Sequence, residues 1–172
     1  MDPIPFLQSH ALFGGLTDEE LQCIIPLLEV RKFPRGCDIV TETETGRELY
    51  LLLEGRVEVI KICPNHPEKA PLRLAELESG DSFGEMHLID IQSRSATVRT
   101  LEETTAYALS HHNIYHLHLE HPDIFTKLIL NIARELSRRL RKMDEWMGSI
   151  LFKAEEPGAL RPVATPATPP DA

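Results

Sequence analysis

The sequence predicts a mainly β domain, an antiparallel sandwich or roll, with a short helix before it and a long helix after it. Two observations predict this fold class. Residues 29–109 consist of short β-type runs separated by glycine, proline and polar turns, a texture typical of antiparallel strands. Residues 125–150 instead carry apolar side chains at a mean spacing of about 3.6 residues, which is one continuous stripe along an α-helix.

The composition limits the partners. A chain of 172 residues with 42% hydrophobic residues is long enough for one core and short extensions. Its 27 acidic and 18 basic residues give a net charge of −9, so we expect neither a nucleic acid nor a membrane surface as partner. No apolar run is long enough to span a bilayer and no signal peptide is present, which favours a cytoplasmic protein.

The first element is a helix that begins after Thr17. Thr17 is a good N-cap, and Glu20 stands at the capping-box position before the apolar residues Leu21, Ile24 and Leu28. Residues 1–28 therefore form an N-terminal helical segment.

Strands follow over residues 29–110. Four glycines stand between them, where a positive φ is easiest for glycine: Gly36, Gly46, Gly55 and Gly80. Residues 64–71 contain three prolines and are predicted to form a hairpin loop. The predicted strands are 30–33, 38–41, 48–53, 56–62, 72–77, 82–83, 95–100 and 104–109.

The chain then becomes helical over residues 111–153. Ser110 is a plausible cap for a short helix to about Glu120, and the long helix begins at Pro122, since proline suits the first helical turn. Residues 154–172 contain five prolines and are predicted to be a disordered tail.

The apolar stripe of the long helix is longer than a small roll can cover. It can pack entirely on its own domain, or its C-terminal half can pair with a second copy or an effector protein. We favour a homodimer through residues 125–150. The basic polar face, including Arg138, Arg141 and Lys142, is interpreted as a solvated face. The stripe comprises Phe125, Ile129, Ile132, Leu136, Leu140, Met143, Met147 and Ile150.

Residues 80–98 carry the chemistry. Gly84 lets a ligand approach the main chain, and a short helix near Glu85 offers free N–H groups. Arg94 presents a planar fork that matches two phosphate oxygens, and the Glu85 carboxylate can accept from a hydroxyl. This combination favours a sugar phosphate as ligand. The alternative is that Glu85 and Arg94 form an ion pair that holds the segment shut and binds nothing.

The segment resembles the phosphate-binding cassette of the cyclic nucleotide-binding domain family, found in catabolite activator proteins, kinase regulatory subunits and gated channels. The resemblance rests on Phe83-Gly84-Glu85 and on Arg94-Ser95-Ala96-Thr97-Val98, with nine residues from Glu85 to Arg94. Residues 36–42 and 49–57 resemble the β-roll of that family. The resemblance spans residues 10–145 and implies a cyclic nucleotide-binding β-roll, jelly-roll-like, in a stand-alone member of bacterial type.

The resemblance also implies a ligand, cyclic AMP or cyclic GMP, and no other cofactor. It implies that Glu85 accepts from the ribose 2′-hydroxyl, that Arg94 neutralises the phosphate, and that Ser95 reaches the phosphate or the base. The sequence departs from the family at His87, where a small residue is usual. The implied binding residues are Phe83, Gly84, Glu85, Met86, His87, Arg94, Ser95 and Ala96.

Two other classes of site are disfavoured. His112 and His116 have the spacing of a helical metal pair, but no Glu follows the first histidine as in a zinc protease, and no Asp or Cys is placed as a further ligand. We therefore expect no metal. No nucleophile motif, P-loop or dinucleotide fingerprint is present, so we expect no enzyme.

The sequence thus predicts a non-catalytic sensor that transmits ligand occupancy through its C-terminal helices, for which the resemblance implies the roles of lid and dimer interface. The alternative is a ligand-free roll that serves as a dimerisation or protein-interaction module. Fewer than thirty residues follow the long helix, which disfavours a transcription factor with its own DNA-binding domain.

Overall fold

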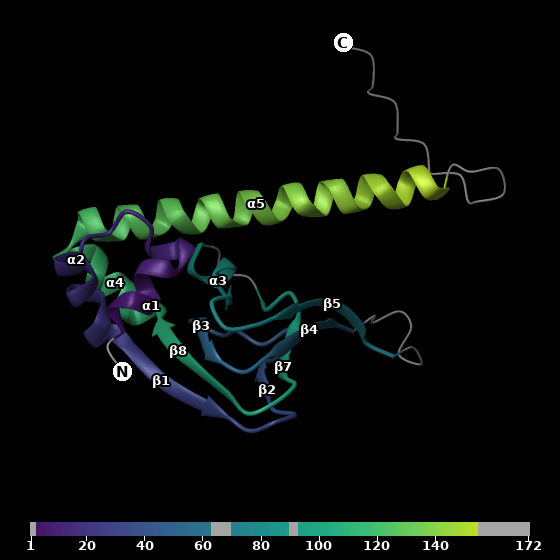
Figure 1. Cartoon of the computed structure of the whole chain (residues 1–172), viewed down its shortest axis with the longest axis horizontal. Helices are drawn as coiled ribbons and strands as arrows, with labels where there is room; N and C mark the ends of the chain where they lie inside the picture. Colours follow the sequence, from purple (N-terminus) through teal and green to yellow (C-terminus); the bar gives the residue numbers. More distant parts are fainter. Residues whose placement is uncertain (1–2, 63–69, 90–92, 155–172) are drawn as a thin grey trace, which may run out of the picture. The chain divides into compact units, whose positions relative to one another are not determined.

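The computed structural model describes residues 3–62, 70–89 and 93–154 (Figure 1). Most of the predicted loop 64–71 and the tail from residue 155 lie outside these residues. The chain forms two compact units, Met1–Ile132 and Ala133–Ala172. Among the described helices, none has both the length and the apolar character that crossing a bilayer requires.

The N-terminal segment confirms the predicted capping box. Helix α2 (Asp18–Ile24) begins after Thr17, whose Oγ1 accepts from the Glu20 N–H at 3.3 Å while the Glu20 carboxylate accepts from the Thr17 N–H at 2.9 Å. Helix α1 (Ile4–Ser9) lies within the segment predicted to be helical, although no separate helix was predicted before Thr17; it has no side-chain cap, and its Leu7 is buried. Two 3-10 turns, η1 (Ala11–Phe13) and η2 (Ile25–Leu27), complete the segment.

Within the described residues, eight antiparallel strands form two four-stranded sheets, ordered β1-β8-β3-β6 and β2-β7-β4-β5. All eight predicted strands are confirmed. The strand predicted from residue 95 begins two residues later, because Ser95 lies in a bend after Arg94. The strands are β1 (Leu28–Phe33), β2 (Asp38–Val40), β3 (Glu48–Glu54), β4 (Val57–Lys61), β5 (Leu72–Leu77), β6 (Ser82–Phe83), β7 (Thr97–Thr100) and β8 (Thr104–Ser110).

The core lies between the two sheets. Tyr50 of β3 and Phe83 of β6 stack with ring centroids 5.1 Å apart, and both are buried. This stacking fixes β6, so the residues that follow it leave the core at a defined point. The other buried members of this cluster are Val40, Leu52, Val57, Val98, Ala106 and Ala108.

The glycine prediction holds in part. Gly36, Gly55 and Gly80 have positive φ values, as expected. Gly46 does not, so that prediction was wrong. Glycine is needed there for space, because a Cβ would lie 2.5 Å from Nε and from Nη2 of Arg94. Thr43, with φ at 74°, is the one described non-glycine residue in this region of conformation.

The C-terminal helices begin as predicted. Helix α4 (His111–Glu120) is capped by Ser110, whose Oγ accepts from the Asn113 N–H at 3.1 Å, and α5 (Pro122–Ala154) begins at the proline. In the first unit, Ile124, Leu128 and Ile132 form the buried face of α5. Ile124 and Leu128 each stand one position before a residue of the predicted stripe, Phe125 and Ile129. The buried face is therefore rotated by one residue from the predicted face in this part of the helix.

Candidate functional site

Residues 83–85 are brought to the site by β6. Gly84 has φ at +86°, and a Cβ there would lie 2.6 Å from the Glu48 carbonyl oxygen and 2.7 Å from Nη1 of Arg94. The positive φ of residue 84 and the lack of space for a Cβ therefore both require glycine at this position. Glu85 follows, 3% exposed, and α3 (Met86–Ile89) begins at the exposed Met86.

Arg94 is buried and held at four points. Its Nη2 donates to the Glu48 carbonyl at 2.8 Å and its Nη1 donates to the Gly84 carbonyl at 3.2 Å. Its main-chain N–H donates to the Glu44 carbonyl and its own carbonyl accepts from the Thr43 N–H, both at 3.0 Å. Residues 43–48, far from the cassette in sequence, thus form the seat of this arginine.

The guanidinium sits in an unusual environment for a cation. Burial lowers the pKa of Arg94, and the nearby Tyr50, Glu48 and Glu85 act in the opposite direction. The group stays charged at physiological pH, as arginines do. Its hydrogen bonds to Glu48 and Gly84 go to main-chain oxygens, whereas the ion-pair alternative expected the guanidinium on the Glu85 carboxylate.

A second layer of side chains holds the seat. The Glu48 carboxylate accepts from the Tyr50 hydroxyl and pairs with Arg31 at 2.8 Å. Burial, followed by this hydrogen bond, raises the pKa of Tyr50. The sequence did not assign Gly46, Glu48 or Tyr50 to the site. The one signal was the glycine at position 46, which was interpreted as a turn residue.

The structure therefore brings together Phe83, Gly84, Glu85 and Arg94. Ser95 is exposed, and its carbonyl accepts from Lys61 Nζ at 2.6 Å, while Ala96 is half-buried. The side chain of His87 and residues 90–92 lie outside the described part of the structure.

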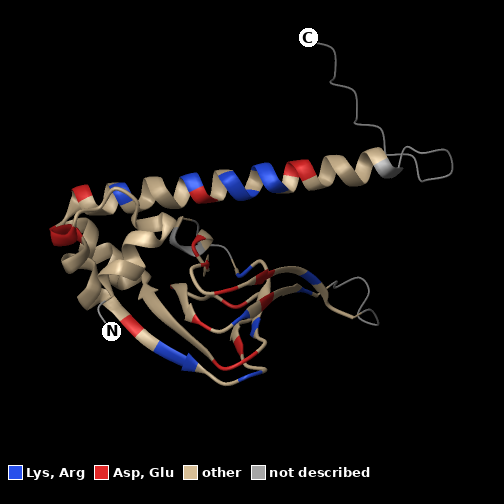
Figure 2. Cartoon of the chain, in the orientation of Figure 1, with Lys and Arg blue, Asp and Glu red and all other residues tan. Residues whose placement is uncertain are grey.

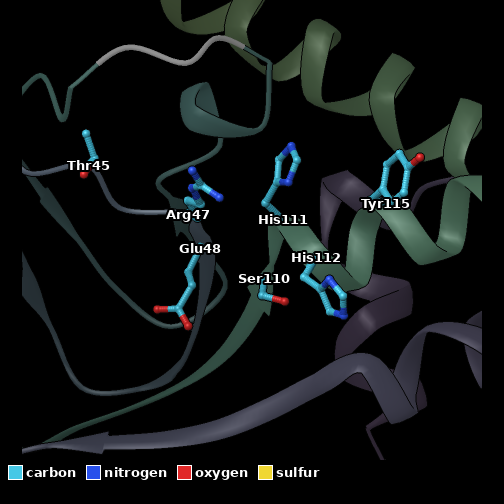
Figure 3. A pocket seen from close by; sticks show the side chains of 7 residues that line it. All are labelled: Thr45, Arg47, Glu48, Ser110, His111, His112 and Tyr115. Atoms are coloured by element: carbon cyan, nitrogen blue, oxygen red, sulfur yellow. The ribbon is translucent and has the colours of Figure 1, made fainter.

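A cavity of about 430 Å³ lies beside the seat, between residues 45–48 and the start of α4 (Figure 3). The His111 N–H donates to the Arg47 carbonyl at 2.8 Å, so the start of α4 is tied to the seat. Figure 3 shows Arg47 and His111 next to each other, with the Glu48 carboxylate directed the other way. The lining residues are Thr45, Arg47, Glu48, Ser110, His111, His112 and Tyr115.

His112 and His116 lie next to each other on α4. The rings of His112 and His116 lie edge to face, with centroids 4.5 Å apart. Over residues 3–62, 70–89 and 93–154, no group of three or more His, Cys, Asp or Glu side chains is placed to hold a metal ion.

Comparisons with known proteins match the roll and its helices. The family model described as cyclic nucleotide-binding domain matches residues 30–121. The cyclic AMP receptor protein of Thermus thermophilus is 32% identical over 147 residues, which cover 86% of this chain and 65% of the relative. The human cGMP-dependent protein kinase 2 is 34% identical over 101 residues, which cover 59% of this chain and 13% of the kinase.

A solved structure gives the same result. The crystal structure of a cyclic nucleotide-binding domain from Methylobacillus flagellatus KT superposes with a TM-score of 0.72 at 30% identity, covering 80% of this chain and 76% of the other. The chain spans just under two thirds of the length of its Thermus relative, at 65%.

Proposed function

The chain belongs to the cyclic nucleotide-binding domain family, and on this premise we propose that it binds cyclic AMP or cyclic GMP and acts as a regulatory sensor, not as an enzyme. The observation that carries the proposal is the seat of Arg94. Arg94 is 6% exposed, and its Nε is buried with no hydrogen-bond partner among the described residues. A buried donor of this kind costs free energy until an acceptor arrives.

The neighbours of Arg94 suit a cyclic sugar phosphate. A phosphate oxygen can accept from the guanidinium, while the Glu85 carboxylate, being acceptor only, can bind a ribose hydroxyl. We propose Phe83, Gly84, Glu85, Met86, His87, Arg94, Ser95 and Ala96 as the ligand-binding residues.

The identity of the base is left to experiment. One relative is named for cyclic AMP and another for cyclic GMP. Ser95 carries a hydroxyl that is compatible with either base, and it is exposed and so accessible to a ligand.

Thermal unfolding with and without millimolar cyclic AMP or cyclic GMP tests the proposal. Ligand at about 100 times its dissociation constant adds about 2.7 kcal/mol, which shifts the midpoint by several degrees. Arg94→Ala should remove the ligand-dependent shift. The matched control is Arg35→Ala, because Arg35 is exposed in the turn before β2. A wild-type protein that responds to neither nucleotide contradicts the proposal.

We further propose that occupancy is transmitted through α4 and α5 to a second copy or an effector protein. Support comes from the exposed apolar residues of the second unit, including Leu140, Met143, Met147 and Ile150. Figure 2 shows Lys and Arg gathered along the middle of α5. We also propose that the chain itself contacts neither nucleic acid nor membrane, which its net charge of −9 supports, and that it works in the cytoplasm.

A further inference from the structure

We infer that Lys61 is a positioning residue of the nucleotide site, which fixes the main chain of the two cassette residues that follow Arg94. The inference rests on the proposed function, since it concerns the same cassette. Lys61 is the last residue of β4, and the register of β4 with β7 ends one residue earlier, at the pair Ile60–Thr97. Beyond this pair a side chain, and not the sheet, connects β4 to the cassette.

The first contact of Lys61 is with the cassette itself. Ser95 and Ala96 lie in a bend between Arg94 and β7, outside the strands. The Nζ of Lys61 donates to the Ser95 carbonyl at 2.6 Å. Because a peptide group is planar, this bond fixes the orientation of the whole group that joins Ser95 to Ala96, and both are proposed ligand-binding residues.

The second contact of Lys61 is with the segment opposite the cassette. Its Nζ pairs with the Glu42 carboxylate at 2.7 Å, and the same carboxylate accepts from the Ile62 N–H at 3.1 Å. The main-chain N–H of Glu42 donates to Oγ1 of Thr97 at 2.9 Å. Lys61 therefore joins Ser95 to a residue that is itself bonded to the first residue of β7.

This ion pair differs from an ordinary surface pair, which contributes little. The Glu42 side chain is only 11% exposed and accepts from two donors, and Lys61 also reaches a main-chain oxygen. The hydrogen bond from Lys61, followed by that from the Ile62 N–H, lowers the pKa of Glu42, so the carboxylate is charged at neutral pH. Both partners are thus held in one geometry by more than their mutual attraction.

The neighbouring Thr43 shows why the two segments need this support. Its φ of 74° lies in the left-handed region, which is unfavourable for a β-branched residue. In this conformation its N–H donates to the Arg94 carbonyl at 3.0 Å. Lys61 holds Glu42, which precedes Thr43, and Ser95, which follows Arg94, so it stabilises this bond from both sides.

Isothermal titration of the full chain with cyclic AMP and cyclic GMP tests the inference. Lys61→Met keeps the aliphatic stem but removes the charged donor. We expect it to weaken affinity about fivefold for the nucleotide that the wild type binds. Lys61→Arg keeps a charged donor and should bind within about twofold of the wild type, because Lys61 acts on two separate acceptors and not through a stacked or forked contact.

Arg73→Met is the matched control. Arg73 stands on the neighbouring strand β5 and pairs with Glu58 at 2.8 Å and with Glu76 at 3.2 Å. It thus also has two partners, and the Glu58 side chain is only 16% exposed, but neither partner belongs to the cassette. Its loss should leave nucleotide affinity within about twofold of the wild type.

Amide hydrogen exchange without nucleotide gives a second readout. The N–H groups of Thr43 and Arg94 are both bonded between the two segments, to the Arg94 and Glu44 carbonyls. We expect Lys61→Met to increase both exchange rates about fivefold, whereas Arg73→Met should leave them unchanged.

Wild-type affinity in Lys61→Met would overturn the inference, as would unchanged exchange rates in that variant. An equal loss of affinity in Arg73→Met, or in Lys61→Arg, would overturn it as well. A wild-type protein that binds neither nucleotide would overturn the proposed function itself, which is a different result.

Discussion

At the scale of single residues, the site depends on a small set of contacts around the start of β3. Arg94 donates to the Glu48 carbonyl, and the Glu48 side chain is held by Tyr50 and Arg31. Tyr50 also stacks on Phe83 in the core, so one side chain links the packing of the roll to the orientation of the seat.

Tyr50→Phe should show this link. The substitution keeps the stacked ring and removes the hydroxyl that donates to Glu48, so we expect a loss of about 1 kcal/mol in the free energy of unfolding. We also expect weaker nucleotide affinity, because Glu48 then loses one of its constraints. Urea denaturation and titration measure the two effects.

Tyr115→Phe provides the comparison for this experiment. Tyr115 is exposed at 54%, and its loss of a hydroxyl should leave stability within about 0.5 kcal/mol of the wild type. Equal effects of the two substitutions would contradict the role assigned to Tyr50.

Sequence patterns identified some of these residues and missed others for a physical reason. Gly84, Glu85 and Arg94 lie within one short segment, so their spacing alone predicts a phosphate site. Gly46 and Glu48 join that site only after β3 and β6 pair, with Tyr50 opposite Phe83. A local sequence pattern does not show which main-chain carbonyl will accept a hydrogen bond from an arginine that is distant in the sequence.

At the scale of elements, the junction of β8 and α4 stands out. β3 and β8 pair with Glu48 opposite Ser110, and the next residue, His111, donates its N–H to the Arg47 carbonyl. The first helical residue after the roll is thus bonded to the seat of Arg94. The cavity of about 430 Å³ beside this junction leaves room for it to shift.

His111→Pro would break this single bond. Proline has no N–H, yet it suits the first position of a helix, and Ser110 before it already has an extended conformation with φ −78° and ψ 151°. We expect nucleotide affinity, measured by titration, to fall several-fold because the seat is then held less firmly.

His111→Ala retains the N–H and should bind as the wild type does. If the alanine variant loses affinity as strongly as the proline variant, the imidazole and not the main-chain bond would be responsible.

The elements themselves were largely predictable from the sequence. Alternating runs and turn residues locate the strands, and Thr17, Ser110 and Pro122 mark the beginnings of three helices. Helix α1 has a proline in its first turn but no side-chain cap, and its Leu7 is buried, so a local pattern marks its beginning less clearly. The rotation of the buried face of α5 likewise reflects tertiary packing, which a helical period does not specify.

At the scale of the whole molecule, the chain consists of the unit Met1–Ile132, which contains the β-roll, and a second unit whose described part is helical. That helical part exposes large apolar residues, with Leu140 at 60%, Met143 at 57% and Trp146 at 63%. Exposed apolar area of this extent on one element is typical of a surface that another protein covers.

A homodimer through α5 should depend on this apolar surface. Met143→Glu combined with Met147→Glu places two carboxylates on it, and we expect sedimentation velocity to show a shift from dimer to monomer. Ser149→Glu adds a charge to the same helix away from these positions and should leave the dimer intact. A wild-type protein that sediments as a monomer at every concentration would contradict the dimer and favour an effector protein as the partner.

The split construction of the Arg94 seat has a consequence for protein engineering. Residues 80–98 look like a portable module, yet their arginine is oriented by carbonyl groups of residues 43–48 and by the missing side chain at Gly46. If residues 80–98 alone were grafted into another β-roll, the arginine would be present, but the carbonyl groups that orient its guanidinium would be missing. Residues 43–48 and 80–98 must therefore be transferred together in such a design. A search for functional relatives among distant sequences must likewise examine both segments.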